Sequence, residues 1–178
     1  LIKNQIGLSL HKAWENMFTA LGVADNSALL EQASLRYRDH FLGIDQTPMP
    51  LYAGVVEGVQ ALEDAGYLLA IATGKARRGL AHALQDSGIE ANFVTTRCAD
   101  EAYSKPHPQM LFDVLEFCGC DASQALMIGD TIYDMQMAQN AGVDSLAVSY
   151  GVQADEILRP LASEGCVPSF AALMARLI

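Results

Sequence analysis

Apolar residues recur every three or four positions through the first part of the chain, which is the spacing of an amphipathic helix. This pattern predicts one helix over Leu10–Leu21, with Ser9 as its N-cap, and a second over Ala28–Leu42. The segment Ile44–Pro50 contains two prolines and indicates a connector, because proline interrupts regular structure. The chain therefore starts with a helical region that ends at this connector.

After the connector, short apolar runs alternate with helical patterns. They predict, in chain order, helix Gly54–Ala65, strand Tyr67–Thr73, helix Arg77–Ser87, strand Phe93–Thr95, helix Pro108–Cys118, strand Leu126–Ile128, helix Thr131–Ala141, strand Ser145–Ser149, helix Gln153–Leu158 and helix Ser169–Ile178. Such alternation is typical of βαβ units and a parallel sheet. We therefore predict an α/β fold, with a Rossmann-like parallel sheet over residues 51–178 and a small all-α domain over residues 1–50.

The composition is that of a globular protein, with 51% hydrophobic and 18% charged residues. A formal net charge of −10 argues against binding to nucleic acid or to an anionic membrane. No apolar stretch of about 18 residues or more predicts a membrane span. The four cysteines lack the spacing of a zinc site, so we expect reduced thiols and a cytoplasmic protein, as a monomer or homodimer.

Two carboxylates, Asp130 and Asp134, follow the apolar run Leu126–Ile128. We expect Asp130 at the carboxyl end of a buried strand, where parallel sheets place their ligands, and Asp134 in the first turn of the next helix. Clustered carboxylate oxygens suit Mg²⁺. The alternative interpretation makes Asp130 a helix N-cap and Asp134 a favourable first-turn acid. The two residues alone do not decide between these interpretations.

Two more loops follow or lie near predicted strand ends at the same edge of the sheet. Thr73-Gly74 offers a hydroxyl and accessible N–H groups, as in a phosphate cradle, although a capping threonine and a turn glycine would look the same. Lys105 lies between Ser104 and Pro106, where a restricted backbone would hold an ammonium toward a phosphoryl oxygen or an anionic nucleophile. The alternative for Lys105 is a solvated surface lysine.

Together these loops resemble motifs II, III and IV of the haloacid dehalogenase-like (HAD) hydrolases, in the same order and spacing. The matching segments are Ala72–Lys75, Ser104–Pro108 and Ile128–Asp134. The segment Ile6–Leu10 and the helices after it resemble the helical cap of the phosphoglycolate-phosphatase-like branch, and Pro50–Val55 resembles the return to the core.

The resemblance implies a Mg²⁺-dependent phosphatase that hydrolyses a small phosphorylated metabolite through an aspartyl-phosphate intermediate. Thr73 and the backbone at Gly74 would hold the phosphoryl group, and Lys105 would steady the nucleophile and the phosphate charge. Asp130 would ligate Mg²⁺, and Asp134 would support the metal directly or through water. Dehalogenase members of the family lack the Gly-Asp-x-x-x-Asp pattern, which favours phosphoryl chemistry here.

The resemblance also implies that a cap closes over the core. The segment Gly7–Lys12 would face the site, with His11 or Lys12 contacting the substrate, unless these two residues form the exposed first turn of a cap helix. Lys75, Arg77 and Arg78 form a small basic cluster, which either attracts an anionic substrate or is a solvated helix start.

The chain contains no Asp-x-Asp that matches motif I of the family, whose first aspartate is the nucleophile and whose second is the general acid/base. We expect an upstream strand that carries motif I and lies between two inner strands of the sheet, and no catalysis without it. The alternatives are a phosphoglucomutase-like member, a phosphonate-cleaving member with Lys12 as its Schiff-base lysine, or a non-catalytic protein that binds a phosphorylated ligand or a partner.

Overall fold

The computed structural model describes residues 1–23, 27–43 and 50–178. The helices are α1 (Leu10–Ala20), α2 (Ser27–Gly43), α3 (Val55–Asp64), α4 (Arg77–Ser87), α5 (Gln109–Cys118), α6 (Ile132–Ala141), α7 (Asp155–Leu158) and α8 (Phe170–Leu177). The strands are β1 (Leu69–Ala72), β2 (Phe93–Arg97), β3 (Leu126–Gly129), β4 (Asp144–Val148) and β5 (Cys166–Val167). Among the described residues, no helix is long and apolar enough to cross a membrane.

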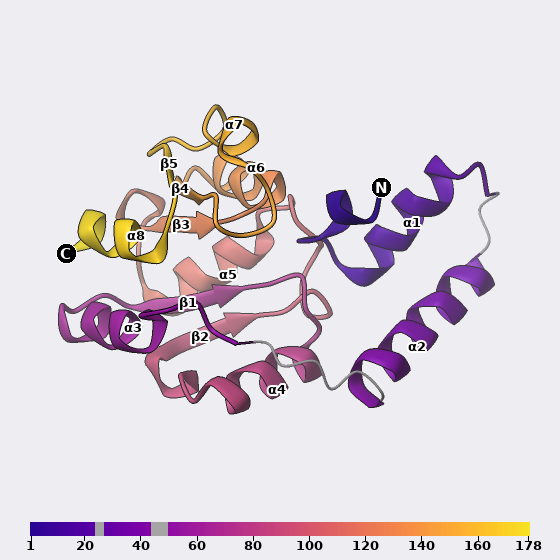
Figure 1. The fold of residues 1–178 in the computed structure, drawn as a ribbon, viewed down its shortest axis with the longest axis horizontal. Coiled ribbons are helices and arrows are strands. Elements are labelled where there is room, and N and C mark those ends of the chain that lie inside the picture. Colours follow the sequence, from indigo (N-terminus) through magenta and orange to yellow (C-terminus); the bar gives the residue numbers. More distant parts are fainter. Residues whose placement is uncertain (24–26, 44–49) are drawn as a thin grey trace.

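The helical start of the chain forms as predicted. The side chain of Ser9 accepts the backbone N–H of Lys12 and so caps α1. The helix α2 follows, and Figure 1 shows both helices to one side of the strands. Residues 44–49 of the predicted connector lie outside the described residues, so the domain boundary at residue 50 stays a prediction.

The fold is α/β with parallel strands, as predicted. β1 pairs with β2, and β4 pairs with both β3 and β5, always in parallel. The strand β1 is shorter than expected, because pairing with β2 begins only at Leu69, while Tyr67 and Leu68 before it are exposed. The two-residue strand β5 was not predicted, since nothing in so short a segment distinguishes it from a loop.

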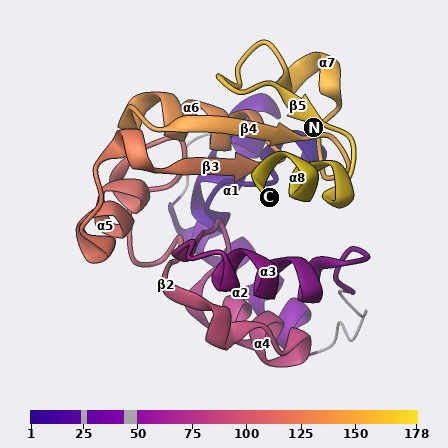
Figure 2. The same cartoon turned by 90° about the vertical axis from the view of Figure 1, so that its left-hand side faces the viewer.

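Each face of β4 packs against a different layer of helices (Figure 2). Leu146 and Val148 belong to a buried cluster with Leu173 of α8, whereas Ala147 between them packs with Met135 of α6 and Leu158 of α7. Alternating burial of this kind is what a strand covered on both faces requires.

The strands form two sheets, β1-β2 and β3-β4-β5, and β1 and β3 are not paired with each other in the described part of the chain. Their arrows point the same way in Figure 1. Ala72 of β1 and Met127 of β3 nevertheless pack against one cluster built from α5 and α6, whose fully buried members include Met110 and Met137. The two sheets therefore share a hydrophobic core without sharing strand hydrogen bonds.

The prediction that the Leu126–Ile128 strand is buried on both faces is wrong for the described residues. Leu126 and Ile128 are each 37% exposed. The reason is that β3 is an edge strand here, with β4 on one side and no described strand on the other.

Candidate phosphate and metal site

Lys105 joins the three predicted loops at the carboxyl ends of β1 and β3. Its Nζ donates to the carbonyl oxygen of Ala72 at 2.8 Å and to Asp134 Oδ1 at 2.6 Å. The side chains of Lys105 and Asp134 are only 6% and 5% exposed. The alternative that Lys105 is a solvated surface lysine is therefore wrong. The loop between β1 and α4, the loop that contains Lys105 and the start of α6 therefore form one site.

Asp134 organises the start of α6. Its Oδ2 accepts the backbone N–H groups of Asp130 and Thr131, at 3.2 and 3.0 Å, and the Thr131 hydroxyl at 2.8 Å. Thr131, not Asp130, is the N-cap, and with Asp134 it forms a capping box. The interpretation of Asp134 as a favourable first-turn acid is thus confirmed, and that of Asp130 as the N-cap is wrong. Gly129 permits this turn, because a Cβ there would collide with the Asp134 side chain.

The carboxylate of Asp130 is held by a loop that follows β4. Its Oδ2 accepts the backbone N–H of Val152 at 2.8 Å, and a Cβ on Gly151 would collide with that carboxylate. Gln153 Oε1 accepts the N–H of Ile132 at the start of α6. The sequence pattern gave no sign that this loop touches the site, since Asp130 and Val152 lie 22 residues apart, with α6 and β4 between them.

Burial raises the pKa of Asp130 above its ordinary value, with the nearby Asp134 charge acting in the same direction. A cation would offset both effects, and Mg²⁺ is commonly held by one or two carboxylates together with water and substrate phosphate. Among the described residues no group of three or more His, Cys, Asp or Glu side chains forms a complete metal cage. The Asp130 carboxylate therefore suits Mg²⁺ that takes its remaining ligands from water and phosphate.

Thr73 and Gly74 continue the β1 backbone into the site. The Thr73 N–H donates to the Arg97 carbonyl at 3.0 Å, and Thr73 Oγ1 accepts the N–H of Lys75 at 3.1 Å. The N-cap of α4 is Ala76, so Thr73 does not cap that helix. Thr73 directly follows Ala72, the residue whose carbonyl oxygen Lys105 binds.

The segment Gly7–Ser9 contacts all three loops. A Cβ on Gly74 would lie 2.7 Å from the carbonyl oxygens of both Gly7 and Leu8, and a Cβ on Gly7 would lie 2.9 Å from Thr131 Oγ1. The N–H of Ser9 donates to Ser104 Oγ at 2.9 Å. The helical region is thus packed directly on the site through this segment.

His11 and Lys12 lie one turn further, on the exposed side of α1. Both side chains face Glu15, at 3.6 Å from His11 Nε2 and 2.9 Å from Lys12 Nζ. The structure places them beyond the segment that contacts the three loops, and their predicted contact with substrate stays a prediction.

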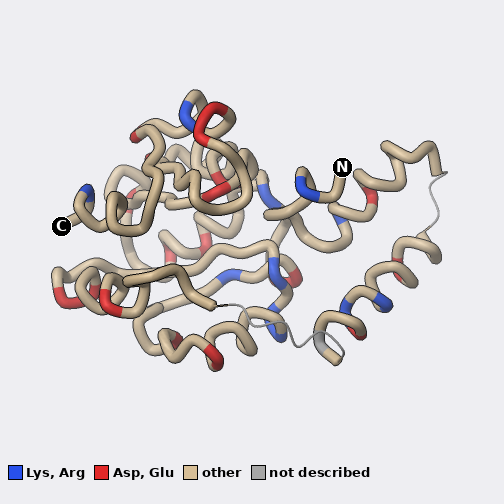
Figure 3. Tube along the Cα trace, in the orientation of Figure 1, with Lys and Arg blue, Asp and Glu red and all other residues tan. Residues whose placement is uncertain are grey.

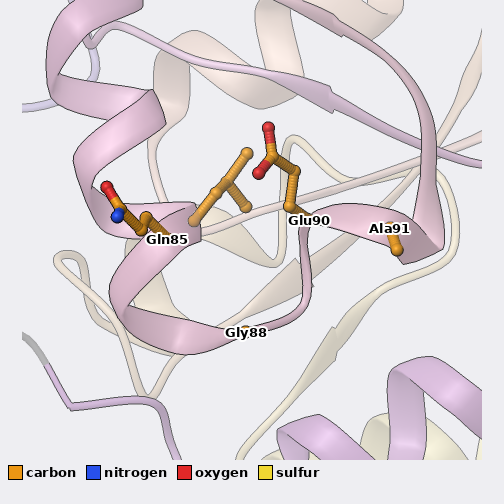
Figure 4. Close-up of a pocket in the computed structure, with 5 residues that line it drawn as sticks. Gln85, Gly88, Glu90 and Ala91 are labelled. Atoms are coloured by element: carbon orange, nitrogen blue, oxygen red, sulfur yellow. The ribbon is translucent and has the colours of Figure 1, made fainter.

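Charged positions of both signs lie at the site end of the strands. Figure 3 shows Lys and Arg positions with Asp and Glu positions among them around the ends of β1 and β2 that point toward the helical region, and further Asp and Glu positions on α3 and α4. A hollow of about 520 Å³ lies at the other end, where α4 leads into β2 (Figure 4). It is lined by Leu84, Gln85, Gly88, Glu90 and Ala91, and contains no predicted site residue.

Known proteins share both the sequence pattern and this fold. Residues 2–148 match the family described as haloacid dehalogenase-like hydrolase. The chain is 34% identical over 172 residues to the "Probable phosphatase IndB" of Dickeya dadantii, covering 95% of this chain and 74% of that protein. It is 32% identical over 159 residues to a phosphoglycolate phosphatase of Mesorhizobium japonicum, with coverages of 89% and 68%. It is 32% identical over 146 residues to pyrophosphatase PpaX of Bacillus cereus, with coverages of 82% and 64%.

Solved structures show the same fold. A structure described as a predicted phosphatase from Clostridium acetobutylicum superposes with a TM-score of 0.86 at 21% identity, covering 98% of this chain and 79% of that one. A hydrolase from Pseudomonas syringae gives a TM-score of 0.87 at 19% identity, covering 99% and 80%. The chain therefore spans between 64% and 80% of the length of these five proteins.

Proposed function

The chain belongs to the haloacid dehalogenase-like hydrolases, and from this premise we propose that it is the phosphate-binding and metal-binding part of a Mg²⁺-dependent phosphatase acting on a small phosphorylated metabolite. The relatives named as phosphatases support hydrolysis of phosphate esters. The magnesium, the residue roles and the intermediate are parts of the proposal.

The observation that carries the proposal is the position of Lys105. A buried ammonium lies against the end of β1 beside Thr73, and it is fixed there by Asp134 of a second motif. A positive charge held in place at a site of low exposure stabilises negative charge more strongly than a mobile surface charge does. In this proposal Thr73 and the backbone of Gly74 bind the phosphoryl oxygens, and Lys105 offsets charge on the phosphoryl group and the nucleophile.

Asp130 is the proposed magnesium ligand, and Asp134 supports the metal site by holding the backbone of Asp130 and the side chain of Lys105. Bound Mg²⁺ would supply positive charge to the phosphoryl oxygens. Because Val152 N–H already binds Asp130 Oδ2, the orientation of that carboxylate is set before any cation arrives.

We propose that the nucleophile lies on a further strand that pairs between β1 and β3. The support is that each of these strands is paired on one side only among the described residues, and that Leu126 and Ile128 of β3 are partly exposed. An aspartate at the end of that strand would attack phosphorus while the bond to the leaving oxygen breaks, and an acid would protonate that oxygen. Water would then release phosphate from the aspartyl-phosphate.

The test is hydrolysis of p-nitrophenyl phosphate by the full-length protein, followed by a panel that starts with phosphoglycolate and pyrophosphate, the substrates after which two relatives are named. Hydrolysis should require Mg²⁺ and should be lost in Asp130→Asn. Asp121→Asn is the matched control, since Asp121 caps the short 3-10 helix that leads into the start of β3, whereas the site follows the other end of that strand, and the substitution should leave the rate unchanged. Undiminished hydrolysis by Asp130→Asn would refute the assignment of this site.

A further inference from the structure

All three nitrogens of the Arg77 guanidinium donate hydrogen bonds within the protein, although the side chain is 43% exposed. Its Nε and one terminal nitrogen donate to the two carboxylate oxygens of Glu101, at 2.7 and 2.6 Å. The other terminal nitrogen donates to Thr96 Oγ1 at 2.6 Å. These donors connect the start of α4 to the segment after β2, while attraction of an anionic substrate by the cluster of Lys75, Arg77 and Arg78 stays a prediction.

The backbones of the same two segments are joined as well. Beyond β1 and β2 the ladder continues through Thr73 N–H to Arg97 O and Ala99 N–H to Lys75 O, each at 3.0 Å. The N–H of Arg77 then donates to Asp100 Oδ1 at 2.9 Å. Since the N-cap of α4 has no side chain that can accept a hydrogen bond, Asp100 supplies the cap from the neighbouring loop.

Glu101 also fixes the loop that leads to Lys105. Its Oε2 accepts the backbone N–H of Cys98, at 3.0 Å, and Cys98 is fully buried beneath α4. Hydrogen bonding from Arg77 lowers the pKa of Glu101, which keeps the carboxylate charged. Ala102, the next residue, packs against the cluster of α5 and α6. The loop is thus anchored only three residues before Lys105 returns to Ala72.

The segments 72–77 and 101–105 are therefore joined at both ends. The Arg77–Glu101 pair joins them at one end, and the Lys105–Ala72 hydrogen bond joins them at the other. We propose that the Arg77–Glu101 pair is a brace that fixes the separation between Thr73 and Lys105, so that Glu101 is a positioning residue for phosphate binding. The inference rests on the proposed function, and it assigns Glu101 a role although the side chain touches neither of the proposed phosphate-binding residues in any contact described above.

A first experiment tests the brace in the chain itself. Amide hydrogen exchange of residues 73–76 and 102–105 should accelerate about tenfold in Glu101→Gln, because the local opening free energy falls when the pair is broken. The matched control is Asp155→Asn, which breaks a second two-bond arginine–carboxylate pair, with Arg159 at 2.6 and 2.7 Å. Exchange in Glu101→Gln that equals that of Asp155→Asn in both segments would overturn the brace.

A second experiment separates positioning from loss of folded protein. In the full-length protein, inhibition of p-nitrophenyl phosphate hydrolysis by inorganic phosphate should weaken about tenfold in Glu101→Gln, and KM should rise with it. Partial unfolding alone would lower the apparent kcat and leave both constants of the folded fraction unchanged. Arg77→Lys, which keeps the charge but not the two parallel bonds, should show the same rise.

The two proposals fail in different ways. If the wild-type protein shows neither hydrolysis nor inhibition by phosphate, while exchange still depends on Glu101, the proposed function is refuted. If the wild-type protein is active and Glu101→Gln has an unchanged KM and an unchanged inhibition constant, the brace is refuted as a positioning device and the proposed function stands.

Discussion

Replacing Lys105 by methionine tests whether the buried ion pair holds the site together. Methionine keeps most of the side-chain length and removes the charge. The substitution leaves the Asp134 carboxylate, whose side chain is 5% exposed, without its counter-charge at 2.6 Å. It also leaves the Ala72 carbonyl without the ammonium that donates to it.

The expected loss of stability follows from these contacts. Breaking a buried ion pair by removing one partner costs about 3–5 kcal/mol. The lower end applies here, because Asp134 Oδ2 keeps three hydrogen bonds from Asp130 and Thr131. Losing the donor to a carbonyl adds about 1 kcal/mol. We therefore expect Lys105→Met to lower the free energy of unfolding by about 4 kcal/mol, or Tm by roughly 8–16 °C in a chain of this size.

The assay is urea unfolding followed by circular dichroism at pH 7. Lys12→Met is the matched control, since its ammonium lies 2.9 Å from Glu15 in a pair whose lysine side chain is 51% exposed. Such exposed pairs contribute about 0–1 kcal/mol, so the control should remain close to the wild type.

A double variant removes both charges. In Lys105→Met with Asp134→Asn, the remaining amide oxygen still accepts from the backbone N–H groups of Asp130 and Thr131, and no buried carboxylate is left unpaired. The double variant should be more stable than the sum of the single effects by about 1–3 kcal/mol. A Lys105→Met loss of less than about 1 kcal/mol, or strictly additive effects, would refute this account of the pair.

Two further predictions concern the contacts around the site. Gly74→Ala should lower the free energy of unfolding by about 1–3 kcal/mol in thermal melts, because the new Cβ would lie 2.7 Å from backbone oxygens of Gly7 and Leu8. Gly43→Ala, whose Cβ meets nothing within 4 Å, is the control, and equal melting of the two variants would contradict the packing. Asp130→Asn should raise the Tm of the metal-free chain at pH 7. Burial raises the pKa of Asp130 in the folded state, so its charge costs stability above the ordinary carboxyl pKa and costs none once the pH falls well below it. Calorimetry at pH 7 and near pH 3 measures this, and an Asp130→Asn chain that melts below the wild type at pH 7 would show that the charge is stabilised instead.

Elements governed by neighbouring residues could be predicted from the sequence. Ser9 caps a helix as expected, and Ser169 caps the helix predicted to begin there, because an N-cap depends on a side chain and the backbone three positions on. The length of β1 and the existence of β5 depend on strands elsewhere in the chain, and the sequence pattern does not contain that information.

The residues of the site could also be predicted from the sequence, whereas their contacts with one another could not. The motif spacing was sufficient to name Thr73, Lys105, Asp130 and Asp134. It did not show that one carboxylate oxygen of Asp134 binds Lys105 while the other accepts the N–H of Thr131. That arrangement depends on the angle between β3 and α6. Nor did it show what Arg77 binds, since its partner lies in a loop 24 residues away.

The contacts of Gly7, Leu8 and Ser9 have a consequence for how variants of this protein combine. One short segment touches Gly74, Thr131 and the serine before Lys105, so substitutions in loops that are distant in the sequence share these partners. Free-energy changes add only for sites without shared partners. Pairs of substitutions drawn from this segment and any of the three loops should therefore be epistatic, and a substitution that is harmful at Gly7 in one background can be tolerated in another where the opposing loop has changed.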